Sequence, residues 1–135
     1  MKKNIFEKIR DEEAEADIVF KNEYVTAFKD IYPCTPVHIL IIPNKMIKSL
    51  NNVEENDSIY LANILISAKK IAEKFKIDDS GYRLITNTGK DGGQEIPYLH
   101  FHLVGGVPLG RMIGLPKNSQ KLFKEFINNN KNIMN

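Results

Sequence analysis

The chain has 135 residues, of which 42% are hydrophobic and 27% are charged, and its formal net charge is +2. These values fit one globular domain, and the balanced charge excludes an electrostatic nucleic-acid binder, which would carry a basic patch or stripe. No apolar run approaches the roughly 18 residues of a membrane span, and the charged start of the chain lacks the apolar core of a signal peptide. The single cysteine, Cys34, cannot form an internal disulfide, so we expect a cytoplasmic protein in a reducing compartment.

The first half of the chain alternates helical and strand patterns. Residues 4–14 carry apolar side chains at helical spacing among charges, which predicts a short amphipathic helix. Two β-rich runs, 17–21 and 25–29, are separated by three residues and predict a hairpin. After a segment with two prolines, "VHILIIP" (37–43) predicts an apolar strand that ends at its proline.

Residues 55–76 give the strongest helix signal in the sequence. Their apolar positions follow the i, i+4, i+7 spacing of a helix that packs one face on a core. The predicted core-facing stripe consists of Leu61, Leu65, Ala68, Ala72 and Phe75, and it is widened by Ile64 and Ile71.

The second half of the chain adds two predicted strands and a last helix. Residues 82–87 and 99–104 are strand-like, and the glycine-rich segment between them, 88–95, is expected to be a flexible loop. Residues 105–116 are irregular, and 118–127 predict a helix followed by an Asn-rich tail that frays. Strands and helices are partly segregated, which favours an α+β fold with a mainly antiparallel sheet.

The three histidines of the chain lie in two of the predicted strands. His100 and His102 occur in "PYLHFHLVGG", and His38 begins the strand 37–43. Because alternate strand residues point to the same face, His100 and His102 project together, about 7 Å apart at their Cα atoms. Tyr98 shares this face, and the intervening apolar residues point into a core. We therefore interpret the histidines as a functional group rather than as incidental core residues.

Two chemistries fit this group of histidines. Three imidazoles can bind zinc and leave a fourth position for water. Alternatively, one imidazole is a nucleophile, and the others shape the site and move protons. The loop "NTGKDGGQE" just before the pair offers closely spaced backbone N–H groups of the kind that hold anions, which favours phosphate chemistry.

The segment "DGGQEIPYLHFHLVGG", with "DIYPCTPVHILIIP" upstream and "IFEKI" near the start, resembles the histidine-triad (HIT) family. Within that family it is most similar to the Hint branch of nucleoside phosphoramidases, over residues 5–116. Counted back from Gly105, the third triad position is His102, the second is His100, and the first is Tyr98 in place of histidine. The resemblance implies one HIT-like domain over 1–135, with a C-terminal helix and tail over 117–135.

The resemblance also implies roles for individual residues. His100 matches the nucleophile, which a backbone carbonyl at the first triad position orients, and the carbonyl of Tyr98 can do the same. His38 matches the upstream active-site histidine, and Asp30 matches the acid that binds the ribose hydroxyls. The positions that match the apolar surroundings of the nucleobase are Phe6, Ile9, Phe28, Ile31 and Leu40. Those that match the surroundings of the phosphate are Asn87, Gln94 and Glu95, and at Glu95 the backbone N–H is expected to face the ligand.

The expected function is hydrolysis of purine nucleoside 5′-phosphoramidates through a covalent nucleotidyl-histidine, with no metal or other cofactor. Family members that transfer nucleotides carry glutamine at the third triad position, and His102 there favours hydrolysis. A dinucleoside polyphosphate hydrolase of the same superfamily is the enzymatic alternative, and a non-catalytic nucleotide- or zinc-binding protein is the other. The resemblance implies a homodimer, with a five-stranded sheet extended across the interface, and no nucleic-acid or membrane partner.

Overall fold

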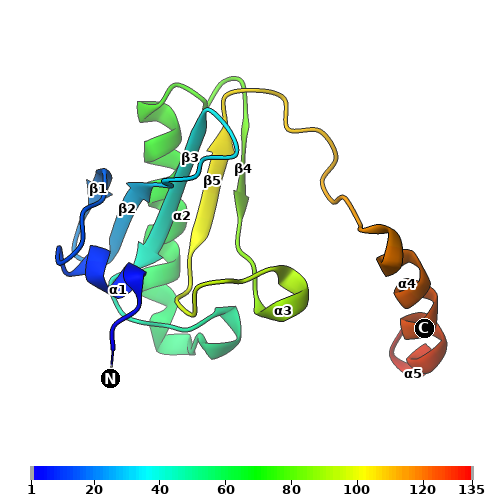
Figure 1. Ribbon diagram of the computed structural model, residues 1–135. Coiled ribbons are helices and arrows are strands. Elements are labelled where there is room, and N and C mark those ends of the chain that lie inside the picture. Colours follow the sequence, from blue (N-terminus) through cyan, green and yellow to red (C-terminus); the bar gives the residue numbers. More distant parts are fainter. Residues whose placement is uncertain (1, 135) are drawn as a thin grey trace.

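The computed structural model describes residues 2–134 and contains a five-stranded antiparallel sheet with strand order β1-β2-β3-β5-β4 (Figure 1). The strands are β1 (Ile18–Lys21), β2 (Val25–Lys29), β3 (Val37–Pro43), β4 (Tyr82–Ile85) and β5 (Phe101–Gly105). The helices are α1 (Ile5–Arg10), η1 (Leu50–Asn52), η2 (Glu55–Asp57), α2 (Ser58–Lys74), α3 (Gly89–Gly92), α4 (Lys117–Asn129) and α5 (Lys131–Met134). This arrangement confirms the predicted α+β class, with one long helix and shorter ones around the sheet.

The two faces of the sheet are covered differently. The long helix α2 packs on one face and forms the larger hydrophobic core, with strand residues such as Ile39, Ile41 and Leu103. The short helix α1 covers part of the other face, where Phe6 and Ile9 pack on residues of β2 and β3 (Figure 1). The histidine-bearing positions lie on this second, less fully covered face.

The outer edges of the sheet also differ from each other. At β1, the pairing with β2 contains a bulge between Ile18 and Phe20, and the Nζ atom of Lys74 donates to the carbonyl of Val19 at 2.8 Å. At the opposite edge, β4 pairs with β5 alone, and its Tyr82 and Ile85 are each 38% exposed. A lysine on an edge carbonyl discourages pairing with another strand. Among the described residues, only the β1 edge is therefore blocked in this way.

Helix α1 is shorter than the predicted segment 4–14. It begins with a capping box between Asn4 and Glu7 and ends at Arg10. The N–H groups of Glu12 and Glu13 then donate to the carbonyls of Ile9 and Lys8, the two bonds of a Schellman motif, and Glu12 takes a positive φ of 60°. No glycine marks this end in the sequence, which is why the helical spacing alone extended the prediction too far.

Helix α2 packs with a stripe that is rotated from the predicted one. Leu65 was expected to face the core, but it is 56% exposed. Ile64 and Ile71 occupy the centre of the buried stripe, together with Ala68 and Ala72. These four residues define one line along the helix, and Leu65 lies beyond the edge of it.

The segment before the histidine pair is more ordered than predicted. The expected flexible loop, 88–95, contains the one-turn helix α3, which ends at Gly93 with φ of +82°, a value that favours glycine. Strand β4 ends at Ile85, and β5 begins only at Phe101. Residues 99 and 100 were predicted to belong to the second strand, but they lie outside the sheet ladder. There the Leu99 N–H donates to the carbonyl of Ile47 at 2.6 Å.

Beyond β5 the chain leaves the body of the fold. Residues 106–116 form an irregular arm, as the sequence predicts, and α4 follows it (Figure 1). The Asn-rich tail was expected to fray, but it forms α5 after a break at Asn130, whose side chain caps the carbonyl of Phe126 at 2.8 Å. Within residues 2–134, we find no helix with the length and apolar character needed to cross a membrane.

The rotated stripe of α2 makes a direct prediction about stability. Replacing Ile71, which is 1% exposed, with alanine leaves a cavity between α2 and the sheet, at a cost of about 2–5 kcal/mol in unfolding free energy. Lys70→Ala, at the exposed neighbouring position, is the control and should change it by less than about 0.5 kcal/mol. Urea denaturation at pH 7 measures both, and equal effects would contradict this packing.

Candidate active site

Strands β3 and β5 bring the three histidines together. In their antiparallel register His38 pairs with Val104 and Leu40 pairs with His102. His38 and His102 are therefore diagonal neighbours on one face, close enough for their side chains to meet. His100 lies two residues earlier, and its ring centroid is 5.0 Å from that of His102. All three imidazoles consequently lie on the face that carries α1.

The protonation of His100 is set by a backbone carbonyl. Its Nδ1 lies 2.7 Å from the carbonyl oxygen of Tyr98, and a carbonyl can only accept. Nδ1 therefore carries the hydrogen, and Nε2 keeps its lone pair. The ring also packs edge-on against Phe6 of α1, with centroids 5.0 Å apart. Burial lowers the pKa of His100, so the ring is neutral at pH 7 and its Nε2 is available as a nucleophile.

His38 and His102 form a chain of hydrogen bonds with a defined direction. The backbone N–H of Cys34 donates to Nδ1 of His38 at 3.1 Å, so His38 carries its hydrogen on Nε2. That Nε2 lies 2.9 Å from Nδ1 of His102 and donates to it. His102 in turn carries its hydrogen on Nε2. The chain thus ends in a donor, next to the nucleophilic candidate His100.

His102 is held in its neutral form by its surroundings. Burial lowers its pKa, and the nearby His100 and His38 lower it further, to about 4. A positive charge on His102 would be both poorly solvated and close to the other two rings, so His102 stays neutral. His102 therefore acts as a hydrogen-bond donor without carrying a full charge at pH 7.

A cavity of about 480 Å³ opens beside the histidines. Most residues that the sequence analysis placed around a nucleotide line it. They are Phe6, Ile9, Phe28, Asp30, Ile31, Leu40, Asn87, Glu95, His100 and His102. The apolar members lie at one end with α1. Ile31 is 79% exposed and forms part of the rim rather than the floor.

Three residues expected at the site do not line this cavity. His38 lies behind His102 and reaches the cavity through it. Gln94 uses its side chain inside the loop, where it donates to the carbonyls of Lys48 and Ile96 at 2.7 and 3.0 Å, so it supports the loop and is turned away from the cavity. Tyr98 was expected among the nucleotide-binding residues, but its side chain is fully buried away from the cavity, and its carbonyl is the group that accepts from His100.

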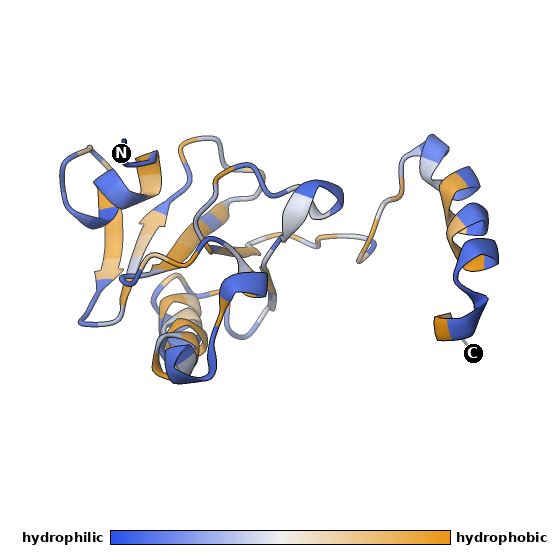
Figure 2. Ribbon diagram, turned by 90° about the horizontal axis from the view of Figure 1, so that it is seen from below, coloured by the Kyte–Doolittle hydropathy of each residue, from blue (hydrophilic) through white to orange (hydrophobic). Residues whose placement is uncertain are grey.

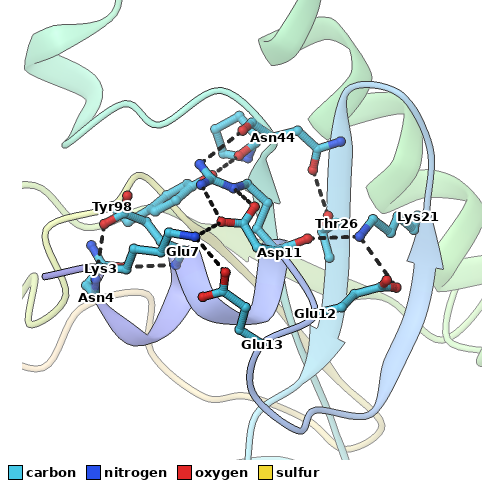
Figure 3. A network of polar contacts seen from close by, with 12 residues as sticks. Lys3, Asn4, Glu7, Asp11, Glu12, Glu13, Lys21, Thr26, Asn44 and Tyr98 are labelled. Carbon is cyan, nitrogen blue, oxygen red and sulfur yellow. Dashed lines mark hydrogen bonds and ion pairs between the residues drawn. The ribbon is translucent and has the colours of Figure 1, made fainter.

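The Tyr98 side chain anchors the segment that leads into β5. Its hydroxyl donates to the carbonyl of Pro43 at the end of β3, and burial raises its pKa to about 12, which keeps it protonated. Arg10 lies over the ring at 5.9 Å and also donates to the carbonyl of Asn44 at 3.3 Å. Figure 3 shows Tyr98 within this network, which connects α1 to the ends of β2 and β3.

Sequence reasoning missed two groups that position the histidines. Thr86 donates from its hydroxyl to the carbonyl of His100 at 2.8 Å. The sequence analysis treats Cys34 only as an isolated thiol, yet its backbone N–H is what orients His38. The sequence does hold a clue to this contact of Cys34, because the residue lies four positions before His38 in a loop bracketed by prolines. Thr86 has no such signal, because its contact depends on how β4 and β5 align.

The same hydrogen bonds weigh against a metal site. Asp30, His38 and His102 each place one possible ligand atom within 4.8 Å of the others. For His38 to ligate through Nε2, its hydrogen would have to move to Nδ1, where it would meet the N–H of Cys34 at 3.1 Å. The donor set therefore fits a hydrogen-bonded relay better than zinc, and we derive no step through a metal.

Comparison with known proteins places this site in a family. The family model of the HIT domain matches residues 11–109. The chain belongs to the HIT family. The purine nucleoside phosphoramidase of Escherichia coli (strain K12) is 49% identical over 109 residues, which cover 81% of this chain and 92% of that protein.

Solved structures agree with this assignment. A HIT family hydrolase from Clostridium thermocellum is 41% identical, with a TM-score of 0.81, over 84% of this chain and 99% of the other. A protein from Streptococcus mutans UA159 is 25% identical, with a TM-score of 0.71, over 98% of this chain and 87% of the other. Together with the family membership, these relatives identify the chain as a hydrolase.

The lowered pKa of His102 predicts a pH-dependent stability. Between pH 6.5 and 4 the unfolded chain protonates this residue while the folded chain does not, so the unfolding free energy falls as the pH falls through this window. After allowance for partial exposure, the loss is roughly 2 kcal/mol. His102→Gln lacks this loss. Urea denaturation at pH 7 and pH 4.5 should therefore show a smaller acid destabilisation in the variant, and identical losses would contradict the burial of a neutral ring.

Proposed function

We propose that this HIT-family hydrolase cleaves purine nucleoside 5′-phosphoramidates, with His100 as the nucleophile. The observation that carries the proposal is the protonation pattern of the histidines. One imidazole keeps a free Nε2 lone pair beside the cavity, and the neighbouring pair ends in an N–H donor. The activity named for the relative from E. coli supports the substrate class.

The reaction follows from these positions in two steps. Nε2 of His100 attacks the α-phosphorus, a phosphorus–nitrogen bond to the ring forms, and the bond to the leaving amine breaks. Nε2–H of His102 donates to a phosphoryl oxygen and stabilises the developing charge. The leaving amine takes its proton from solvent, relayed at His102, which lines the cavity, and the water that attacks in the second step returns a proton to solvent. This water cleaves the nucleotidyl-histidine, which restores the site.

The remaining cavity residues suit a purine nucleoside. The carboxylate of Asp30 lies in the cavity and is an acceptor for the two ribose hydroxyls. The apolar end, formed by Phe6, Ile9, Phe28 and Leu40, offers a surface for the base. Tyr98 replaces the first triad histidine but keeps its carbonyl function. We also propose that the protein is a cytoplasmic homodimer, in line with its free, exposed Cys34 and its open β4 edge.

A dinucleoside polyphosphate hydrolase would use the same nucleophile and donors, so the leaving group distinguishes the two activities. Comparing kcat/KM for adenosine 5′-phosphoramidate with that for diadenosine tetraphosphate separates them, and a preference for the second would overturn the proposal. A non-catalytic nucleotide-binding protein would bind AMP and turn over neither substrate. The zinc-binding alternative is disfavoured by the fixed hydrogen on Nε2 of His38.

The first test of the mechanism removes the nucleophile. His100→Ala should lower kcat for adenosine 5′-phosphoramidate by about 10³-fold or more, because no covalent intermediate can form. The dissociation constant for AMP should stay within about threefold, since the base and ribose contacts remain. Turnover near the wild-type rate in this variant would refute the assignment. Wild-type protein quenched with denaturant at alkaline pH, where the phosphorus–nitrogen bond is stable, should carry a nucleotidyl group on His100 by mass spectrometry.

The second test addresses the anchoring of Tyr98. Tyr98→Phe leaves the carbonyl of Pro43 without its donor and frees the peptide whose carbonyl orients His100. We expect kcat to fall by about tenfold, because the loss of one hydrogen bond changes a free energy by an amount of this order. KM should stay unchanged, because the Tyr98 side chain lies outside the cavity. Nitrogen-15 NMR should show His100 losing its strict Nδ1–H form.

The matched control for Tyr98 is Tyr24→Phe. It removes a tyrosine hydroxyl near the α2 face of the sheet, where Tyr24 packs on Tyr60. This variant should keep the wild-type kcat and His100 spectrum. If both variants behave alike, Tyr98 has no specific role in positioning the nucleophile.

A further inference from the structure

The mouth of the active-site cavity carries an exposed aromatic side chain that the proposed reaction does not use. Tyr32 lines the cavity beside Ile31, and the two side chains are 83% and 79% exposed. Other tyrosines of the chain are packed, since Tyr24 and Tyr60 meet edge-on and Tyr98 is fully buried. Tyr32 therefore offers most of its ring surface at the entrance to a ligand cavity.

The loop that carries Tyr32 connects β2 to β3 and is held at several points. The Asp30 N–H donates to the carbonyl of His38 at 3.0 Å, and the Tyr32 N–H donates to Oδ1 of Asp30 at 2.8 Å. Pro33 follows directly, and the Cys34 N–H donates to His38. The backbone is thus restricted on both sides of Tyr32, so the ring can contact a ligand at a low cost in conformational entropy.

The place of Tyr32 in the cavity corresponds to the base end of a bound nucleoside. One carboxylate oxygen of Asp30 accepts from the Tyr32 N–H, and the other lies 3.4 Å from Nε2 of His38. The proposed ribose acceptor therefore lies between the histidines and the turn at Tyr32. A nucleotide whose phosphorus reaches His100 and whose ribose reaches Asp30 extends its base away from the histidines, with Tyr32 at the rim.

The apolar floor of the cavity forms where α1 meets the sheet. Figure 2 shows the largely hydrophobic strands between α1 on this face and α2 on the other. In the floor, Phe6 and Phe28 are buried and meet edge-to-face, with ring centroids 5.5 Å apart. A flat base that lies on this floor turns its second ring face toward the mouth, where Ile31 and Tyr32 stand.

We propose that Tyr32 is a specificity-determining residue, whose ring stacks on the outer face of the nucleobase and favours purine over pyrimidine nucleotides. Every base can stack on an aromatic ring, and the two-ring purine covers more of it than a pyrimidine does. The stacked base is remote from the reacting phosphorus, so the contact lowers KM and leaves kcat unchanged. The inference rests on the proposed function for the orientation of the nucleoside.

The competing position for this ring is against the leaving amine of the substrate. We favour the base because the amide of Tyr32 is bonded to the proposed ribose acceptor, Asp30, on the side away from the histidines. The leaving amine departs from the phosphorus, beside His100 and His102. A contact with the amine would make the effect of Tyr32 depend on the amine and not on the base.

Substitutions at Tyr32 separate the ring from its hydroxyl. Tyr32→Ser should raise KM for adenosine 5′-phosphoramidate about tenfold, because a stacked base is lost, and leave kcat within about twofold. Tyr32→Phe keeps the ring and should match the wild type. With uridine 5′-phosphoramidate, Tyr32→Ser should raise KM by about threefold at most. The control, Leu50→Ser, removes an exposed apolar side chain outside the cavity and should change neither constant.

A tryptophan at the same position reports the contact directly. The chain contains no tryptophan, so Tyr32→Trp introduces a single indole fluorophore. AMP should quench its emission, because a base stacks on the indole, and UMP should quench it less. The control is Tyr60→Trp on α2, which packs on the opposite face of the sheet from the histidines. Its emission should not respond to AMP.

Three results would overturn the proposal. One is an unchanged KM for adenosine 5′-phosphoramidate in Tyr32→Ser, and another is an emission of Tyr32→Trp that ignores AMP. The third is a loss in Tyr32→Ser that is equal for adenosine and uridine but differs between the phosphoramidates of ammonia and benzylamine. If the wild type cleaves no phosphoramidate, the proposed function fails separately, and the AMP and UMP titrations still test the base contact.

Discussion

The site depends on two backbone groups that decide where each imidazole keeps its hydrogen. The carbonyl of Tyr98 accepts from Nδ1 of His100 and exposes a lone pair, while the N–H of Cys34 donates to His38 and sends a hydrogen forward through His102. Reversing the first bond would turn the free lone pair of His100 into a donor, and reversing the second would turn the donor end of His102 into an acceptor. Two neighbouring imidazoles on one face of the sheet thus present a free lone pair on His100 and an N–H donor on His102.

The two faces of the sheet differ in how much of each is covered, and this difference makes room for the histidines. The α2 face holds most of the apolar packing, with Ile39, Ile41 and Leu103 fully covered. The other face is covered mainly by the short α1, which leaves room for a cavity of about 480 Å³ and lets Phe6 touch His100 directly. Burial there lowers the pKa of His100 and His102, which keeps both rings neutral at pH 7, and it still leaves them open to the cavity.

Sequence reasoning recovered the elements whose signal is local. The strands 25–29 and 37–43 have the predicted bounds, and the rings of His100 and His102 lie together as strand alternation predicts, although β5 begins only at Phe101. The failures have tertiary causes. Leu65 lies beyond the edge of the stripe that α2 buries, and Gln94 turns away from the cavity because the carbonyls of Lys48 and Ile96 accept its amide. Neither the packing around Leu65 nor the hydrogen-bond partners of Gln94 can be identified from the sequence pattern.

The unequal edges of the sheet limit how far it can grow. With Lys74 on the Val19 carbonyl and a bulge beside it, β1 cannot add a strand easily, whereas β4 can. If a second copy paired with β4, the joined sheet would end in a blocked β1 strand on both sides, and no further strand could add. The unequal edges would thus set a finite size for a sheet that is strongly apolar.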